Sequence, residues 1–195
     1  MDVIKSIIKN SIDVKQQVLN SHDLLSTIGT VINVVTEAFK NGKKVYFCGN
    51  GGSAADAQHL AAEFSGRFYI DRKALPAEAL HCNTSYLTAV GNDYSYDVIY
   101  ARLIEGIGKE GDILIGLSTS GNSKNIINAF QIARDLGIRT VSLTGESGGS
   151  LATLSDFLIN VPSKDTPRIQ EAHILIGHII CQLVEERYFS NTPTN

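Results

Sequence analysis

The chain has 195 residues, of which 43% are hydrophobic, and 17 basic against 20 acidic side chains give it a net charge of −3. A chain of this length forms one domain that folds without a disulfide or structural metal, and its composition excludes a disordered protein and a basic surface that coats nucleic acid. No apolar run is long enough to span a membrane, the first residues show no secretory signal, and three widely spaced cysteines without a CxxC pair predict a reducing cytoplasm.

The first 42 residues predict two helices, because apolar side chains recur at helical spacing in both halves. Asn41 and Gly42 end the second helix, since both tolerate the left-handed backbone of a C-cap. We expect residues 1–42 to serve oligomerisation as part of the same domain. The domain continues over 43–189 and is followed by a frayed tail, 190–195.

From residue 43 on, short apolar runs alternate with helical patterns. The runs are typical of buried parallel strands and are predicted at 44–48, 77–81, 112–117, 139–143 and 157–161. The helical patterns between them cover 53–64, 85–90, 96–107 and 124–136. A last helix follows from Pro167, a residue favoured in a first turn, to Tyr188. This alternation predicts an α/β fold, with a mainly parallel β-sheet between two layers of helices.

The last helix is apolar nearly all round. The surface of a single domain buries only one stripe of such a helix. We therefore expect this helix to lie in an oligomer interface together with the N-terminal helices.

Three loops at the predicted carboxyl ends of strands, 49–53, 118–123 and 144–150, could bind an anion at a helix N-terminus. Loop 118–123 has no acidic side chain and favours a phosphate monoester through four hydroxyl groups, those of Ser118, Thr119, Ser120 and Ser123. Serine and glycine loops can also be plain turns and caps.

The first of these loops also matches the dinucleotide pattern G-x-G-x-x-[GA] through Gly49, Gly51 and Ala54. The acidic residue expected about 20 positions later has no clear strand end to occupy. A nicotinamide-dependent oxidoreductase is therefore only weakly supported.

Candidates for proton chemistry come from the few histidines. His59 and Glu63 are four residues apart and share a helix face. On the apolar last helix, His178 shares a broad face with either Gln170 or Glu171, and spacing alone does not choose between them. Such pairs are often surface ion pairs or core hydrogen bonds, but polar groups on so apolar a helix need a polar partner. Two other histidines are expected to be structural or exposed, His22 and His81.

Six short motifs, spread over nearly the whole chain, occur in the order in which a known family has them. They are 48–53, 58–63 with 66–67, 91–93, 118–123, 143–145, and 168–173 with His178. In these stretches the chain resembles the phosphoheptose isomerases of the sugar isomerase (SIS) domain superfamily. The resemblance implies a single SIS domain with extra N-terminal helices for oligomerisation.

The resemblance also implies an aldose–ketose isomerase. The expected reaction converts D-sedoheptulose 7-phosphate to D-glycero-D-manno-heptose 7-phosphate through an enediol, the first step toward the heptose of lipopolysaccharide cores or other surface glycans. The resemblance assigns phosphate binding to Ser118, Thr119, Ser120 and Ser123. It assigns the rest of the substrate to Asn50, Gly51, Gly52, Ser53, Arg67, Asn92, Asp93 and Gln170.

Members of the family are homotetramers with sites between subunits, and several bind zinc. The resemblance implies one Zn²⁺ per subunit, held by His59, Glu63, Gln170 and His178, which selects Gln170 over Glu171. Isomerisation needs a base and a group that stabilises the enediolate, so we expect Glu63 as base and His178 as its acid–base partner. Ligands of zinc are less free to move protons, and the sequence leaves open how the two roles combine.

One alternative is a non-catalytic SIS-domain protein that binds the replication initiator. That relative keeps the loop pattern but not the residues at the positions of Glu63 and His178, so their presence here favours the enzyme. One departure from the family concerns Pro167, which stands where some members have Asp. Asp165, two residues earlier, could substitute for it.

Overall fold

The computed structural model describes residues 1–190, so the expected tail lies outside the described residues except for Ser190. The described helices largely follow the predicted ranges. They are α1 (Asp2–Asn20), α2 (His22–Lys40), α3 (Gly52–Ser65), α4 (Thr84–Asp93), α5 (Ile99–Ile107), α6 (Lys124–Asp135) and α7 (Thr166–Phe189), with 3₁₀ turns η1 (Tyr96–Val98) and η2 (Gly149–Thr153).

The five strands form one parallel sheet in the order β2-β1-β3-β4-β5. They are β1 (Val45–Gly49), β2 (Ala77–Ala79), β3 (Ile113–Ser118), β4 (Arg139–Thr144) and β5 (Phe157–Asn160). Because all strands point the same way, the loops that follow β1, β3 and β4 meet at one edge of the sheet. The predicted α/β class is confirmed.

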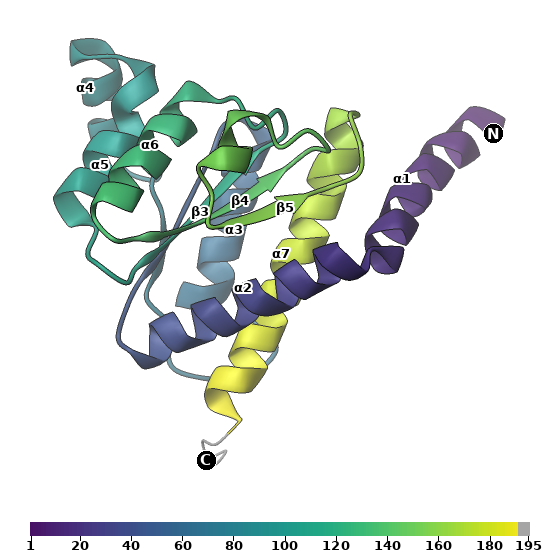
Figure 1. Cartoon of the computed structure of the whole chain (residues 1–195), viewed down its shortest axis with the longest axis horizontal. Coiled ribbons are helices and arrows are strands. Elements are labelled where there is room, and N and C mark those ends of the chain that lie inside the picture. The colour runs from purple at the N-terminus through teal and green to yellow at the C-terminus, as the bar shows by residue number, and fades with distance from the viewer. Residues whose placement is uncertain (191–195) are drawn as a thin grey trace.

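Side chains of each strand alternate between two apolar layers. In β1, Val45 and Phe47 face the layer beneath α2, α3 and α7, whereas Tyr46 and Cys48 face the layer beneath α5 and α6. Figure 1 shows α2 and α7 crossing one side of the sheet, with α5 and α6 on the other. The chain is therefore a three-layer α/β/α domain.

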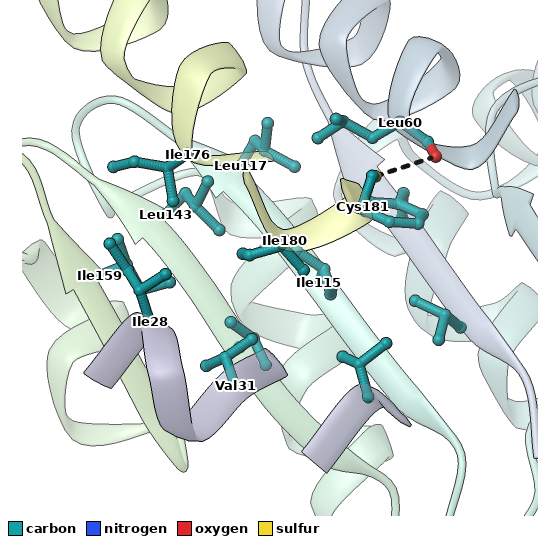
Figure 2. Packing of buried hydrophobic residues seen from close by; sticks show 14 of the residues in the cluster. Ile28, Val31, Leu60, Ile115, Leu117, Leu143, Ile159, Ile176, Ile180 and Cys181 are labelled. Atoms are coloured by element: carbon teal, nitrogen blue, oxygen red, sulfur yellow. Dashed lines mark hydrogen bonds between the residues drawn. The ribbon is translucent and has the colours of Figure 1, made fainter. Parts of the chain in front are cut away.

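Helix α7 is buried mainly within its own chain. Figure 2 shows Ile176 and Ile180 of this helix over Leu117 and Leu143 of the sheet. The same view has Cys181 beside α3, where its Sγ donates to a main-chain oxygen at 3.9 Å. Helices α2 and α3 cover α7 from two sides, but Leu175 and Ile179 remain exposed on its outer face.

The apolar surface that remains uncovered lies mainly on α1. This helix extends away from the body of the domain in Figure 1. Its exposed large apolar side chains are Val3, Ile4, Ile7, Ile8, Ile12 and Leu19. An oligomer interface formed by α7 together with the N-terminal helices stays a prediction.

Small differences from the predicted elements have local causes. Helix α3 begins at Gly52, one residue before the expected start, because Gly51 takes a left-handed φ of 55° at the N-cap. The predicted helix 96–107 begins as a 3₁₀ turn, and β2 has only three residues. The turn η2 has no counterpart in the prediction. Among the helices of the described range, none combines the length and apolarity needed to cross a membrane.

Candidate active site

The loops after β3 and β4 lie backbone against backbone at the carboxyl edge of the sheet. The Gly145 N–H donates to the Thr119 carbonyl at 2.9 Å. A side chain on Gly121 would collide with the carbonyl of Gly148, and Gly121 itself has a φ of 66°. Glycine is thus required where these two loops touch.

The hydroxyl-rich loop that follows β3 is ordered by its own side chains. Ser118 is buried, and its Oγ lies 2.9 Å from the Ser123 Oγ. Ser123 stands at the N-cap of α6, but its hydroxyl does not cap the helix. The first N–H groups of α6 therefore remain available to an anion.

A cleft of about 380 Å³ opens between the loops after β3 and β4. Its walls include the predicted phosphate ligands Thr119 and Ser120, together with Gly145 and Ser147. Glu146 also lines the cleft, and its carboxylate is paired with Lys164 at 3.0 Å. The cleft thus offers hydroxyl and backbone donors to a ligand.

The predicted substrate residue Asn50 is held by a partner that the sequence did not reveal. Asn50 and Asn125 exchange two amide hydrogen bonds, of 3.0 and 2.8 Å, and Asn125 is buried at the start of α6. The Tyr96 hydroxyl also donates to the Asn50 Oδ1 at 3.1 Å. No local sequence signal identifies Asn125, because its partner Asn50 lies 75 residues away along the chain.

The structure brings three predicted metal ligands together. One Nε2 or carboxylate oxygen from each of His59, Glu63 and His178 lies within 4.8 Å of the others. The Nε2 of His59 is 2.8 Å from a Glu63 oxygen and 3.2 Å from the Nε2 of His178. Two neighbouring helices supply them, α3 the first two and α7 the third.

Helices α3 and α7 approach closely because a glycine lies at their crossing. A Cβ on Gly177 would be 2.5 Å from a methyl carbon of Leu60, one residue after His59. The backbone of α7 can therefore lie against Leu60. This contact sets how far His178, the next residue of α7, stands from α3.

Two more side chains complete the surroundings of this cluster, and sequence reasoning missed both. The Phe68 ring stacks on the imidazole of His178, with centroids 5.5 Å apart and an interplanar angle of 27°. Burial raises the pKa of Asp56, although the positive potential of His59 and His178 acts in the opposite direction.

The structure separates Gln170 from Glu171. The Gln170 amide nitrogen is 2.7 Å from where a Cβ would stand on Gly52, at the glycine loop. The Glu171 carboxylate instead accepts from Ser11 of α1 and from Arg168, at 2.5 Å each. Only Gln170 therefore faces α3, which agrees with the choice that the resemblance made.

Gln170 lies on α7 before the residues of the compact cluster. It precedes His178 by eight residues, or about 12 Å along a helix. To join His59 and His178 as a metal ligand, its side chain would have to turn from Gly52 toward His178. Its present position suits contact with a ligand at the glycine loop.

The remaining predicted substrate residues lie elsewhere. Ser53 is buried in the first turn of α3. Arg67 is exposed just beyond the opposite end of that helix from the glycine loop. Asn92 and Asp93 are exposed at the end of α4, with one hydrogen bond of 3.0 Å between their side chains. A single chain therefore does not gather all the predicted residues into one site.

The donor set of the cluster fits zinc. Two imidazole nitrogens and one carboxylate oxygen are ordinary zinc ligands, and three protein ligands are typical of catalytic sites. Tetrahedral bonds of the usual length hold ligand atoms roughly 3.3 Å apart. Two observed separations are 3.2 and 2.8 Å, and all three atoms lie within 4.8 Å of one another, so small side-chain movements bring them to this spacing.

Comparisons with known proteins agree over nearly the whole chain. The family model described as SIS domain matches residues 9–145. A "Phosphoheptose isomerase" of Clostridium acetobutylicum is 54% identical over 186 residues, 95% of each chain, and one of Aneurinibacillus thermoaerophilus is 55% identical over 190 residues, 97% of this chain and 96% of that one.

Solved structures give the same result. A phosphoheptose isomerase from Francisella tularensis superimposes with a TM-score of 0.91 at 37% identity, covering 95% of this chain and 97% of that one. A phosphoheptose isomerase from Neisseria gonorrhoeae gives a TM-score of 0.89 at 39% identity, covering 95% and 98%.

Proposed function

The chain belongs to the phosphoheptose isomerases of the SIS domain family and is a sugar-phosphate isomerase, and we propose that it converts D-sedoheptulose 7-phosphate to D-glycero-D-manno-heptose 7-phosphate. The observation that carries this proposal is the pairing of Glu63 with two imidazoles on α3 and α7. Both helices begin at the edge of the sheet that holds the hydroxyl-rich cleft. The cleft can bind a phosphate at the start of these helices, and the cluster further along them can move a proton.

The reaction moves a carbonyl group from C2 to C1 of the sugar. Glu63 removes a proton from C1, and the resulting enediolate carries the negative charge on oxygen. His178 exchanges protons with the two oxygens, and Glu63 returns its proton to C2. A positioned acid or base of this kind contributes roughly 10²- to 10⁴-fold to the rate.

The phosphate binds at the N-terminus of α6. Thr119, Ser120 and Ser123 donate hydroxyl groups, and the free N–H groups of the helix add their partial positive charge. Ser118 orients the Ser123 hydroxyl through their hydrogen bond of 2.9 Å. Asn50, fixed by Asn125, and the glycine loop with Gln170 contact the sugar.

One Zn²⁺ per subunit would be held by His59, Glu63 and His178, with Gln170 as fourth ligand after its side chain turns from Gly52. When bound, zinc supplies a Lewis acid that polarises the carbonyl oxygen. Glu63 and His178 must then be free of the metal for part of the cycle in order to carry protons. The half-exposed position of His59 leaves one side of the cluster open to substrate.

The enzyme works as a homotetramer with sites between subunits. The uncovered apolar face of α1 supports this assembly, because exposed apolar patches of this kind mark association surfaces. Arg67 lies exposed between Glu63 and Phe68 of the cluster's surroundings, whereas Asn92 and Asp93 lie exposed at the end of α4, as expected of residues that contribute to a neighbouring subunit's site. The three cysteines are all free, which supports a cytoplasmic location. The product would supply heptose for a surface glycan.

The test is incubation of the purified protein with sedoheptulose 7-phosphate, followed by NMR of the aldose product, with and without a chelator. Product that disappears on chelation and returns with zinc supports the isomerase and its metal site. Product that is indifferent to complete metal removal contradicts the metal site and keeps Glu63 and His178 as plain acid–base groups. A folded tetramer that forms no product under either condition contradicts the isomerase and favours the replication-initiator-binding alternative.

A further inference from the structure

A buried ion pair joins the segment after α3 to the end of α7. The Arg72 Nε donates to a Glu185 oxygen at 2.7 Å, and the two side chains are 2% and 1% exposed. Glu185 also accepts from the backbone N–H groups of Phe68, Tyr69 and Ile70, at 3.1, 2.8 and 3.2 Å. One carboxylate on α7 therefore fixes three consecutive residues of the segment 66–72.

The other end of Arg72 caps α3. Its Nη2 donates to the Glu63 carbonyl at 2.7 Å. Its Nη1 donates to the carbonyls of Phe64 and Gly66, at 2.7 and 2.9 Å. These carbonyls belong to the last turn of the helix and the residue that ends it, where intrahelical partners run out. Arg72 thus holds the turn from which the Glu63 side chain projects.

The clamped segment also reaches His178. The Phe68 ring lies against the imidazole at 5.5 Å and 27°, and the N–H of the same residue is one of the three that Glu185 binds. His178 and Glu185 are seven residues apart on α7, so they lie on one face of that helix. The Arg72–Glu185 ion pair therefore connects the backbone of Glu63 to the Phe68 ring that packs on His178.

The many hydrogen bonds of Arg72 and Glu185 indicate that the pair fixes a local conformation as well as stabilising the fold. A buried ion pair is by itself weak evidence for stability, because apolar side chains of similar size often replace one without loss. Here the carboxylate has four donors, and the guanidinium has five acceptors, namely the carboxylate and four backbone carbonyls. Apolar replacements could fill the same space but could not fix the segment 66–72 in this conformation.

We propose that Arg72 and Glu185 are positioning residues that hold Glu63 and the Phe68-supported ring of His178 in register for proton transfer. This role rests on the proposed function, since it concerns the same two groups. Neither residue touches the substrate. Misplacement of a reacting group by about 1 Å can cost on the order of a hundredfold in rate, which is the scale on which such a clamp acts.

The test compares kcat and KM for sedoheptulose 7-phosphate in variants of the full-length protein. Phe68→Leu leaves the ion pair intact and removes only the ring over His178, and we expect its kcat to fall about tenfold with KM within about twofold of wild type. Phe68→Tyr keeps an aromatic ring at this position, so its kcat should stay near that of wild type. Arg72→Lys keeps the charge but loses the forked donors, so its kcat should fall at least as far as that of Phe68→Leu.

The matched control is Asp112→Asn. Asp112 is a buried carboxylate that accepts two backbone N–H bonds, from Lys44 and Lys109 at 2.9 Å each. It lies at the amino edge of the sheet, away from the cluster. We expect Asp112→Asn to lower the melting temperature while kcat stays within about twofold of wild type. An equal loss of kcat in this control would overturn the proposal, because general loosening of the fold would then explain the other variants.

A second readout does not need activity. In protein with ¹³C-labelled histidine, the ring of Phe68 shifts the His178 proton resonances through its ring current. Glu185→Gln and Arg72→Lys should move these resonances toward their positions in Phe68→Leu, and Asp112→Asn should not. Unmoved resonances, or an unchanged kcat in Phe68→Leu, would overturn the proposal. A wild-type protein without isomerase activity would instead refute the proposed function, and the spectra would still decide whether the ion pair positions the ring.

Discussion

His173 predicts a measurable dependence of stability on pH. This side chain is fully buried on α7, and its Nε2 donates to the Thr144 carbonyl at 3.1 Å, while the Nδ1 atom has no partner among the described residues. Burial lowers the pKa of His173 to about 4, and the hydrogen bond to the carbonyl opposes this only in part. The imidazole is therefore neutral in the native protein, whereas in the unfolded chain it titrates near 6.5.

The direction of the effect follows from proton binding. Between pH 6.5 and 4 the unfolded chain binds a proton at this position that the native protein does not, so stability falls as pH falls. From pH 7.5 to pH 5 the loss from His173 alone amounts to about 2 kcal/mol. This is a large part of the total stability of an ordinary domain.

The assay is urea unfolding of wild type and His173→Gln at both pH values. Glutamine offers an N–H to the Thr144 carbonyl but does not titrate. Between pH 7.5 and pH 5, the free energy of unfolding of His173→Gln should therefore fall by about 2 kcal/mol less than that of wild type. A chelator and a fixed protein concentration remove contributions from metal and from association. His22→Gln is the control, because the His22 side chain is 97% exposed and its replacement should leave the dependence unchanged. Equal losses in wild type and His173→Gln would refute the reasoning.

Three further substitutions test the site. Glu63→Gln should lower kcat at least about a hundredfold while inorganic phosphate still binds, and near-normal turnover would exclude Glu63 as the base. Replacing Ser120 and Ser123 together by Ala should chiefly raise KM, and an unchanged KM would mean that the phosphate binds elsewhere. Gly177→Ala puts a Cβ 2.5 Å from Leu60, so urea unfolding should show a loss of about 1–3 kcal/mol. Zinc titration should also show weaker binding, and normal affinity would mean that this crossing does not set the cluster.

The fold could be predicted from the sequence because its signals are local. Each buried strand is a short apolar run, and each helix that follows has its own start and stop residues, such as Gly137, which ends α6 with a φ of 72°. The apolar pattern of α7 was visible but its partners were not. Periodicity shows how much of a helix is apolar, and only the tertiary fold shows that α2 and α3 cover two sides of α7 and leave Leu175 and Ile179 exposed.

The site could be predicted only where it lies on motifs. His59 and Glu63 share a helix face at a spacing of four, so their pairing could be read directly from the sequence. Asn125 and Phe68 carry no such pattern, because their partners Asn50 and His178 lie 75 and 110 residues away along the chain. Contacts of this kind depend on how helices cross the sheet, which no local signal encodes.

The catalytic geometry is for the same reason a property of the packing between two helices. Helix α3 starts at the glycine loop and carries Glu63 in its last turns, whereas α7 carries His178 next to the glycine that lets the helices touch. The segment 66–72 supports both functional side chains from one side, through Arg72 at the end of α3 and Phe68 against His178. A substitution in the apolar contact between α3 and α7 should therefore alter catalysis before it unfolds the domain, because small shifts at this crossing change the distance between His59 and His178 directly.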